Sequence, residues 1–289
     1  MTIRKALETG RKTLSASPSP ALDTRLILEY VLDTSHSYII AHDETIMSPT
    51  QEYRFLSLLE RARNGEPIPY LVGKTNFYGL EIKVTPSVLI PRPETEQLVN
   101  LALEWIARPS RRQRQPLIVD VGTGSGCIAL ALASALPLTR IEATDVSKAA
   151  LEVAEENARA LGLENRVDFY NGQYLNPIVD EPDLIVANLP YIADHEWTTL
   201  AVGVKWHEPD VALRGGSDGM DGIRQLLAQA GNRLAPGGAI ILEIGWKQGE
   251  AAKLLAKSTF PSAQIDVKKD LSGHDRVVCI YTSDVDGDV

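Results

Sequence analysis

The chain has very little cysteine and no long hydrophobic run. Only Cys127 and Cys279 occur among its 289 residues, which excludes a disulfide scaffold and a zinc site made of four thiolates. The longest nearly apolar stretch, Gly126 to Leu138, is shorter than the ~18–20 residues that a membrane-spanning helix needs. The first residues include no apolar segment of the kind found in secretory signals. We therefore expect a cytoplasmic protein with a core large enough to fold without crosslinks.

A surplus of basic residues is also absent. The chain has 29 Lys and Arg against 38 Asp and Glu, which gives a formal net charge of −9. Residues 1–85 contain ten of each sign, so residues 86–289 carry the whole excess, with 19 basic and 28 acidic residues. Proteins that bind nucleic acid mainly through its phosphates usually contain a basic domain. We therefore expect no direct nucleic acid binding.

The first 64 residues are predicted to form a small helical bundle. Ser48 and Gln51 have the spacing of a capping box, and Pro49 suits the first helical position. The segment after them is apolar on one face until Gly65. A second amphipathic helix is predicted upstream. The residues that indicate it are Leu22, Leu26 and Tyr30, flanked by Ile27 and Val31.

A hinge is predicted after the bundle. Residues 77–84 alternate well enough to form a strand, and residues 88–90 are expected to return beside it as a β-hairpin. This divides the chain into a helical domain at residues 1–75, a hairpin linker at 76–93 and a larger domain at 94–289.

Strands and helices alternate from about residue 94. Apolar runs indicate strands at residues 117–121, 141–143, 167–170, 184–187, 239–244 and 277–281. Helical stretches lie between most of them, notably at residues 127–136, 148–161 and 220–234. This alternation predicts an α/β fold, with a doubly wound, mostly parallel sheet covered on both faces. Ligands of such sheets bind at the carboxyl ends of the strands.

The first of these strands runs into a glycine-rich turn. Its residues are Gly122, Thr123, Gly124, Ser125 and Gly126. A dinucleotide site would need a glycine at the position of Cys127. The spacing instead resembles motif I of the class I methyltransferases, which bind S-adenosylmethionine. Asp145, at the end of the second strand, is placed to accept hydrogen bonds from ribose hydroxyls. The alternative is that Asp145 only caps the following helix, which Ser147 could do equally well.

The fourth strand ends in Asn188, Leu189, Pro190 and Tyr191. This resembles the (Asn/Asp)-Pro-Pro-(Tyr/Phe) motif of amino-methyltransferases, with Leu189 in place of the first proline. An amide nitrogen is a poor nucleophile because its lone pair is delocalised. The side-chain oxygen of Asn188 and the carbonyl of Leu189 could accept its two N–H groups and turn the lone pair toward a methyl donor. Pro190 stiffens the turn, and Tyr191 offers a flat wall. The alternative is an ordinary Asn-x-Pro turn.

Further segments make the resemblance specific. Residues 90–96, Ile-Pro-Arg-Pro-Glu-Thr-Glu, resemble a signature of the release-factor glutamine methyltransferase family. Residues 65–71 and 77–79 are similar to the interdomain segment of that family. Residues 208–219 match its Glu-Pro and Gly-Gly-x-Asp-Gly pattern, and residues 273–278 resemble its closing strand. The resemblance covers roughly residues 50–282.

This resemblance implies a seven-stranded sheet and a methyl transfer from S-adenosylmethionine. The acceptor would be the side-chain amide nitrogen (N5) of the glutamine in the Gly-Gly-Gln loop of class I peptide chain release factors. The partner would be the release factor, recognised by the helical domain, and we expect a monomer that binds no membrane.

The resemblance also assigns roles to residues. The residues expected to hold the cofactor are Gly122, Thr123, Gly124, Ser125, Gly126, Asp145, Tyr174 and Asn188. Those expected to hold the glutamine amide are Asn188, Leu189, Pro190 and Tyr191, of which Asn188, Pro190 and Tyr191 would be catalytic. Gln173-Tyr174 stands where the family often has Asp-Trp beside the adenine. Tyr174 can stack there, whereas Gln173 supplies no carboxylate.

Other interpretations stay open at this point. Arg92, Glu94 and Glu96 could shape a substrate cleft, or they could form ion pairs that orient the helical domain. Asn-Leu-Pro-Tyr also resembles the motif of ribosomal-RNA adenine dimethylases, so adenine N6 in RNA or DNA is an alternative acceptor. A methyl-donor fold kept as a binding module is a third. We expect no metal site, because His195 lacks partners at ligand spacing.

Overall fold

The computed structural model describes residues 1–108, 115–199 and 202–283. The chain divides into two compact units. Residues Met1–Lys74 and Ala201–His207 form one, here called the helical unit, and Thr75–Leu200 with Glu208–Val289 form the sheet unit. No motif in the sequence indicates that residues 201–207 group with the helical unit. The three-part division at residues 75 and 93 stays a prediction.

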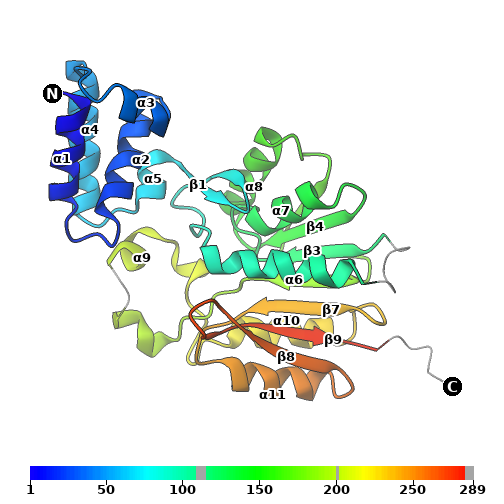
Figure 1. Cartoon of the computed structure of the whole chain (residues 1–289). Coiled ribbons are helices and arrows are strands. Elements are labelled where there is room, and N and C mark those ends of the chain that lie inside the picture. The colour runs from blue at the N-terminus through cyan, green and yellow to red at the C-terminus, as the bar shows by residue number, and fades with distance from the viewer. Residues whose placement is uncertain (109–114, 200–201, 284–289) are drawn as a thin grey trace. The chain divides into compact units, whose positions relative to one another are not determined.

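Helices make up the helical unit (Figure 1). They are α1 (Ile3–Thr13), α2 (Pro20–Leu32), α3 (His36–Ala41), α4 (Pro49–Arg63), α5 (Ile68–Val72) and α9 (Val202–His207). The predicted capping box is confirmed, since Gln51 N donates to the Ser48 hydroxyl and the Gln51 side chain accepts from Ser48 N. These two bonds satisfy free N–H groups at the start of α4 and fix where it begins.

The helix predicted around Leu26 is α2, but only some of the apolar residues that indicated it are buried. Ile27 and Leu28 are fully buried, whereas Leu22 and Tyr30 are 44% and 41% exposed. Helix α2 is apolar on more than one side, so its pattern does not determine which side faces the core. Its contacts with α1, α4 and α5 make that choice.

The hairpin also differs from the prediction. Residues 77–84 are not one strand, because the chain turns at Tyr78 and Gly79 between β1 (Lys74–Phe77) and β2 (Leu80–Lys83). Both turn residues have positive φ, 51° and 77°, as a two-residue type I′ turn requires. The buried residues Val88 and Ile90 lie in an irregular segment and not in a returning strand.

A seven-stranded sheet forms the core of the sheet unit, which confirms the predicted fold class. Its strands are β3 (Leu117–Val121), β4 (Arg140–Asp145), β5 (Val167–Asn171), β6 (Leu184–Ala187), β7 (Ala239–Glu243), β8 (Gln264–Lys269) and β9 (Asp275–Tyr281). The order is β5-β4-β3-β6-β7-β9-β8, and only β9 runs antiparallel to its neighbours. The six predicted strands are all present. The seventh, β8, is a half-buried edge strand whose polar sequence hides it.

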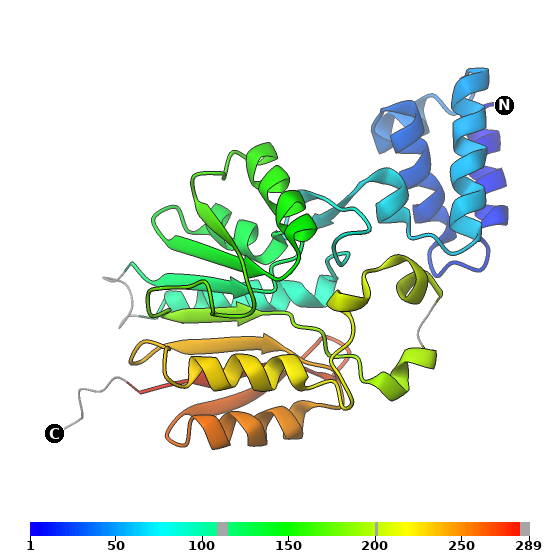
Figure 2. The ribbon, with the colours of Figure 1, turned by 180° about the vertical axis from the view of Figure 1, so that it is seen from behind.

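Helices cover both faces of this sheet. They are α6 (Glu96–Ile106), α7 (Cys127–Ala135), α8 (Lys148–Ala160), α10 (Asp221–Ala230) and α11 (Gly249–Thr259), with short 3-10 turns η1 (Pro93–Thr95), η3 (Asp194–Thr199) and η4 (Asp210–Ala212). Val119 and Val121 of β3 pack in one core with residues of α10 and α11, which lie in front of the sheet in Figure 2. Asp120 points to the other face, where it accepts a hydrogen bond from Ala129 N of α7.

The register brings three strand ends to one edge. Val121 of β3 lies beside Thr144 of β4 and beside Ala187 of β6. The residues that follow these strands therefore meet at the carboxyl edge of the sheet, where such folds bind ligands.

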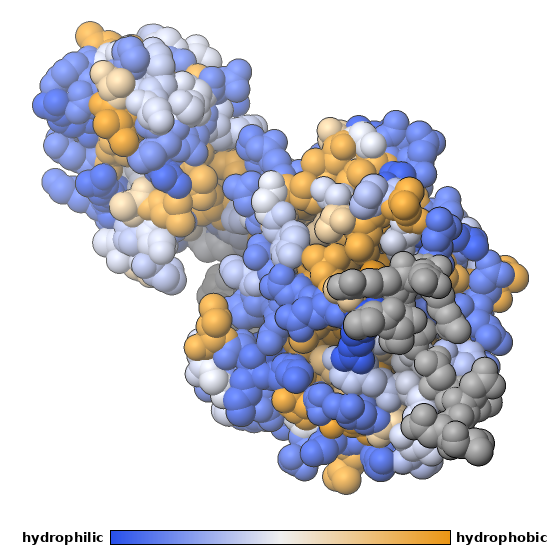
Figure 3. Space-filling view, turned by 45° about the vertical axis from the view of Figure 1, so that its right-hand side comes forward, coloured by the Kyte–Doolittle hydropathy of each residue, from blue (hydrophilic) through white to orange (hydrophobic). Residues whose placement is uncertain are grey.

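Hydrophilic residues cover most of the face of the molecule shown in Figure 3. No helix in the described part of the chain is long and apolar enough to cross a membrane.

Candidate functional site

A cavity of about 540 Å³ lies at the carboxyl ends of β3, β4 and β6. This is the size of a small-molecule site. It brings together most of the residues singled out from the sequence. Those that line it are Gly122, Thr123, Gly124, Ser125, Asp145, Gln173, Tyr174, Asn188, Leu189 and Pro190. Gly126 and Tyr191 do not line it.

The glycine-rich turn forms one wall. Gly122 and Gly124 have positive φ, 74° and 57°, which residues with a Cβ rarely adopt. Apart from its two chain neighbours, no residue places an atom within 4 Å of the position that a Cβ on Gly124 would occupy, so the space there is open to a ligand. Gly126 has a different role, because a Cβ on it would lie 3.1 Å from Ala154 Cβ. Its missing side chain lets α7 begin close to α8.

Asp145 faces this turn from the end of β4. Its Oδ2 accepts from Gly124 N at 2.9 Å, and its Oδ1 accepts from Ser147 N at 2.8 Å. Burial raises the pKa of Asp145, and backbone donors, Ser147 N first, partly offset this. The hydroxyl of Ser147 accepts from Ala150 N and caps α8, so the interpretation of Asp145 as the N-cap is wrong. Each carboxylate oxygen keeps accepting capacity for a ligand hydroxyl.

Tyr174 lines the cavity with a strained backbone. Its φ is +52°, an unusual value for an aromatic residue. The Thr144 hydroxyl donates to the Tyr174 carbonyl at 2.9 Å and holds that conformation. Residues kept in sparsely populated backbone regions are frequent at ligand sites. Gln173 lines the cavity beside it.

Asn188 follows β6 and is tied to two residues that sequence reasoning missed. Its Nδ2 donates to the Thr95 hydroxyl at 3.1 Å, and that hydroxyl donates to Glu243 Oε2 at 2.7 Å. Burial raises the pKa of Glu243, and the hydrogen bond from Thr95 opposes this. A signal for Glu243 existed, since it is an acidic residue at the carboxyl end of an otherwise apolar strand. Thr95 lies inside the signature at residues 90–96 but was not singled out.

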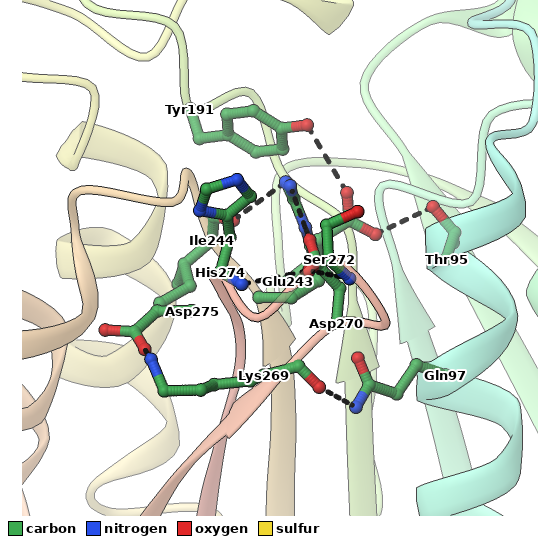
Figure 4. Close-up of polar contacts among 11 residues, drawn as sticks. Thr95, Gln97, Tyr191, Glu243, Ile244, Lys269, Asp270, Ser272, His274 and Asp275 are labelled. Atoms are coloured by element: carbon green, nitrogen blue, oxygen red, sulfur yellow. Dashed lines mark hydrogen bonds and ion pairs between the residues drawn. The ribbon is translucent and has the colours of Figure 1, made fainter.

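Tyr191 belongs to this polar cluster and not to the cavity wall. Figure 4 shows its hydroxyl pointing toward Glu243, and the distance to Oε1 is 3.4 Å. Burial and the negative charge of Glu243 raise the pKa of Tyr191 to about 12. The flat wall predicted from Tyr191 is therefore not part of this cavity lining. Leu189 and Pro190 do line it, and Leu189 packs over Gly122.

Comparisons with known proteins fit this geometry. A model of the PrmC N-terminal domain matches residues 5–73, and a model of the methyltransferase small domain matches residues 101–205. The chain is 41% identical over 284 residues to the release factor glutamine methyltransferase of Moorella thermoacetica, covering 97% of this chain and 99% of that protein. The chain belongs to the release factor glutamine methyltransferase family.

A second member of this family gives the same result. The release factor glutamine methyltransferase of Bordetella pertussis is 41% identical over 270 residues, covering 92% of this chain and 97% of that protein. Among solved structures, a methyltransferase from Pyrococcus furiosus is similar with a TM-score of 0.51 and 16% identity, covering 78% of this chain and 97% of that one. At that identity the likeness concerns the fold. The predicted family membership is confirmed.

Two of the three charged residues of the family signature, Arg92 and Glu96, hold this segment in place. Arg92 forms an ion pair with Glu208, whose side chain is 1% exposed and also accepts from Ile90 N. Glu96 accepts from Tyr78 N at 2.8 Å. All of these partners belong to the sheet unit. These contacts favour ion pairing over a role in a substrate cleft, but they fix the segment around Thr95 and do not involve the helical unit.

Neither a nucleophilic cysteine nor a metal cluster is found among the described residues. Cys127 is buried, and burial raises the pKa of its thiol to about 12, so the thiol stays protonated and packs at the start of α7. In the part of the chain that the structure describes, no group of three or more His, Cys, Asp and Glu could hold a metal ion.

Proposed function

We propose that this protein transfers a methyl group from S-adenosylmethionine to the side-chain amide nitrogen (N5) of the glutamine in the Gly-Gly-Gln loop of class I peptide chain release factors. One observation carries the proposal beside the family membership. Asn188, whose amide can orient a nitrogen nucleophile, lines the same cavity as the glycine-rich turn and Asp145.

The residues of the cavity fit the cofactor. Asp145 offers two carboxylate oxygens to the two hydroxyls of a ribose, one bonded to Gly124 N and the other to Ser147 N. Gly124 leaves open space where a side chain would stand, and Tyr174 offers an aromatic ring. Gln173 can share a hydrogen bond with an adenine but supplies no charge. When bound, S-adenosylmethionine supplies an electrophilic methyl group on a sulfonium.

The chemistry asks the protein mainly to orient the glutamine amide. Asn188 Oδ1 and the Leu189 carbonyl each accept one N–H, which points the nitrogen lone pair at the methyl group and stabilises charge that develops on nitrogen. Asn188 and Leu189 would hold the amide while the bound cofactor supplies the methyl group in exchange for its bond to sulfur, and the proton released from the nitrogen would pass to water. No strong base is needed, because the nitrogen becomes acidic only as it is alkylated.

The helical unit is proposed to recognise the body of the release factor. It is close to neutral, so a broad electrostatic attraction is not its means of binding. It exposes large apolar side chains, with Ile46 76% and Tyr53 74% exposed, and such side chains are typical contacts of protein partners. A cytoplasmic location and a monomeric state complete the proposal.

The alternative acceptor is adenine N6 in RNA or DNA. Its support is Leu189, which makes the motif Asn-Leu-Pro-Tyr. The missing basic surplus counts against it.

Incubation with methyl-labelled S-adenosylmethionine and either release factor or ribosomal RNA separates the two. Label on the release factor that disappears when the loop glutamine is replaced supports the proposal. Label on RNA alone would promote the adenine alternative.

A further inference from the structure

We propose that Thr95 is a positioning residue which, together with the buried carboxylate of Glu243, fixes the Asn188 amide with its oxygen left for the substrate. This inference rests on the proposed function, because it concerns how the same site orients the glutamine amide. The three side chains form one line of hydrogen bonds, from Asn188 to Thr95 and from Thr95 to Glu243.

The donors and acceptors of this line determine its direction. An ionised carboxylate only accepts hydrogen bonds, so the single O–H of Thr95 donates to Glu243. The Thr95 oxygen can then only accept a hydrogen bond from Asn188, and the sole donor in that amide is Nδ2. Asn188 therefore turns Nδ2 toward Thr95. Its Oδ1, which none of the described residues donates to, is the atom that remains for an N–H of the substrate.

Neighbouring elements hold the line in place. Ala187 lies beside Leu242 in the parallel pair β6–β7, so Asn188 and Glu243 follow at the same edge of the sheet. Thr95, the last residue of η1, contributes the side chain that bonds to both of them, and Figure 4 shows its contact with Glu243. Thr95 and Glu243 are each 2% exposed, which leaves little room for water to replace a bond. An unrestrained Asn side chain could present either its oxygen or its nitrogen to the substrate. The hydrogen bonds from Asn188 to Thr95 and from Thr95 to Glu243 leave only the oxygen available.

The groups around Glu243 decide whether it can act as the acceptor. Arg276 and the hydroxyl of Tyr191 favour the ionised form, as Thr95 does. Burial and the charge of Glu94 oppose it, and the Cys127 thiol lies near it without charge. A protonated Glu243 could donate to Thr95, which would then donate to Asn188 Oδ1 and occupy the atom that the substrate needs. The same geometry therefore links loss of turnover at low pH to Glu243.

Substitution of Thr95 tests the inference directly. Thr95→Val keeps the shape and removes the hydroxyl, whereas Thr95→Ser keeps the hydroxyl. Thr282→Val is a matched control that also removes a hydrogen-bonded threonine hydroxyl. The Thr282 hydroxyl donates to the carbonyl of Gly238, the residue before β7, at the end of this strand that lies away from Glu243. With release factor as substrate, we expect Thr95→Val to lower kcat about 10- to 100-fold, since misorientation of a reacting group has costs of that order. KM and the affinity for S-adenosylmethionine should change less than about threefold, and Thr95→Ser and Thr282→Val should keep kcat within about threefold.

Opposite results would overturn the inference. They are an unchanged kcat in Thr95→Val, equal loss in Thr95→Ser, or a cofactor affinity that falls in parallel with kcat. The pH profile gives a second measurement. We expect kcat of the unsubstituted protein to fall at low pH. The Glu243→Gln variant should have a lower kcat that no longer falls at low pH. A Glu243→Gln variant with a lower kcat and the same fall at low pH would contradict the orientation of Asn188 by an ionised Glu243.

The failure of the proposed function looks different from the failure of this inference. If the unsubstituted protein does not label release factor, the proposed function fails. If it labels release factor and Thr95→Val does so equally well, only the role of Thr95 fails.

Discussion

Asn188 and Thr95 lie 93 positions apart in the sequence, and a 3.1 Å hydrogen bond joins the amide nitrogen of one to the hydroxyl of the other. This bond connects two motifs that look independent in the sequence, the signature at residues 90–96 and the turn after the fourth parallel strand. It explains why a signature outside the glycine-rich turn and the Asn188 turn belongs to the site. The signature supplies a side chain that holds the amide expected to orient the substrate.

Replacement of Asn188 by alanine is expected to lower turnover at least about 100-fold, because the acceptor for one substrate N–H is lost. Affinity for S-adenosylmethionine, measured by calorimetry, should stay within about threefold. Asn100→Ala is a control at an exposed asparagine of α6, which accepts from the Tyr78 hydroxyl. A collapse of cofactor affinity in Asn188→Ala would instead show that Asn188 acts mainly on the cofactor or on the structure.

Asp145→Ala is expected to act mainly on cofactor binding. Hydrogen bonds to a charged acceptor contribute about 1.5–3 kcal/mol, so the dissociation constant should rise about 10- to 100-fold. Asp168→Ala, at an exposed aspartate of β5, is the matched control and should leave the dissociation constant of S-adenosylmethionine unchanged. Unchanged affinity in Asp145→Ala would exclude the ribose assignment.

The ion pair of Arg92 and Glu208 is expected to matter for stability. Arg92→Met leaves a carboxylate with 1% exposure without its cation. Loss of one partner of a buried pair costs about 3–5 kcal/mol, and the partial exposure of Arg92 reduces this to about 1–3 kcal/mol of unfolding free energy. Arg224→Met removes an exposed pair with Asp218 and should cost less than about 1 kcal/mol. Equal unfolding midpoints in urea for both variants would contradict this ranking.

Asp120 should make stability depend on pH. Burial, opposed first by the hydrogen bond from the Thr123 hydroxyl, raises its pKa from 3.8 to about 7. The native state then holds this proton more tightly than the unfolded chain. The resulting contribution to stability is fully present below about pH 4 and is lost as pH rises toward about 7. The advantage of the unsubstituted protein over Asp120→Asn in urea unfolding should shrink from pH 4 to 7, whereas parallel curves would show that Asp120 titrates normally.

Exposed apolar residues of the helical unit provide a test of recognition. We expect Ile46→Glu and Tyr53→Glu to raise KM for the whole release factor about tenfold or more, because contacts with a partner are lost. Methylation of a short Gly-Gly-Gln peptide should not change. Leu138→Glu, at a similarly exposed leucine of the sheet unit, is the control. Equal loss on both substrates would argue against recognition by the helical unit.

Local sequence patterns predicted the parts of the fold that depend only on nearby residues, such as a helix terminus or a strand that is buried on both faces. The capping box at Ser48 and the buried strands of the parallel sheet are of this kind. The buried face of α2 depends on which neighbours pack against it, and β8 is an edge strand with only two apolar residues, Ile265 and Val267. The turn at Tyr78 needed a positive φ that its aromatic side chain does not suggest.

The residues of the candidate site also divide into those that the sequence predicted and those that it did not. The residues after strand ends, Asp145 and Asn188, were predictable because parallel strands end at one edge. Thr95 was not, since the contact of a 3-10 turn with two strand ends depends on the assembled sheet. Glu243, at the end of another parallel strand, left a signal that was not used. Tyr191 was expected at the cavity because it follows Asn188, but its ring turns toward Glu243.

Fragmentation mass spectrometry of a release factor treated with this protein and S-adenosylmethionine tests the central claim most directly. The account predicts one added methyl group on the side-chain amide nitrogen of the glutamine in the Gly-Gly-Gln loop. It also predicts no methylation when that glutamine is replaced or when the protein carries Asn188→Ala. A methyl group on any other residue, or none on the release factor despite measurable cofactor binding, would contradict it.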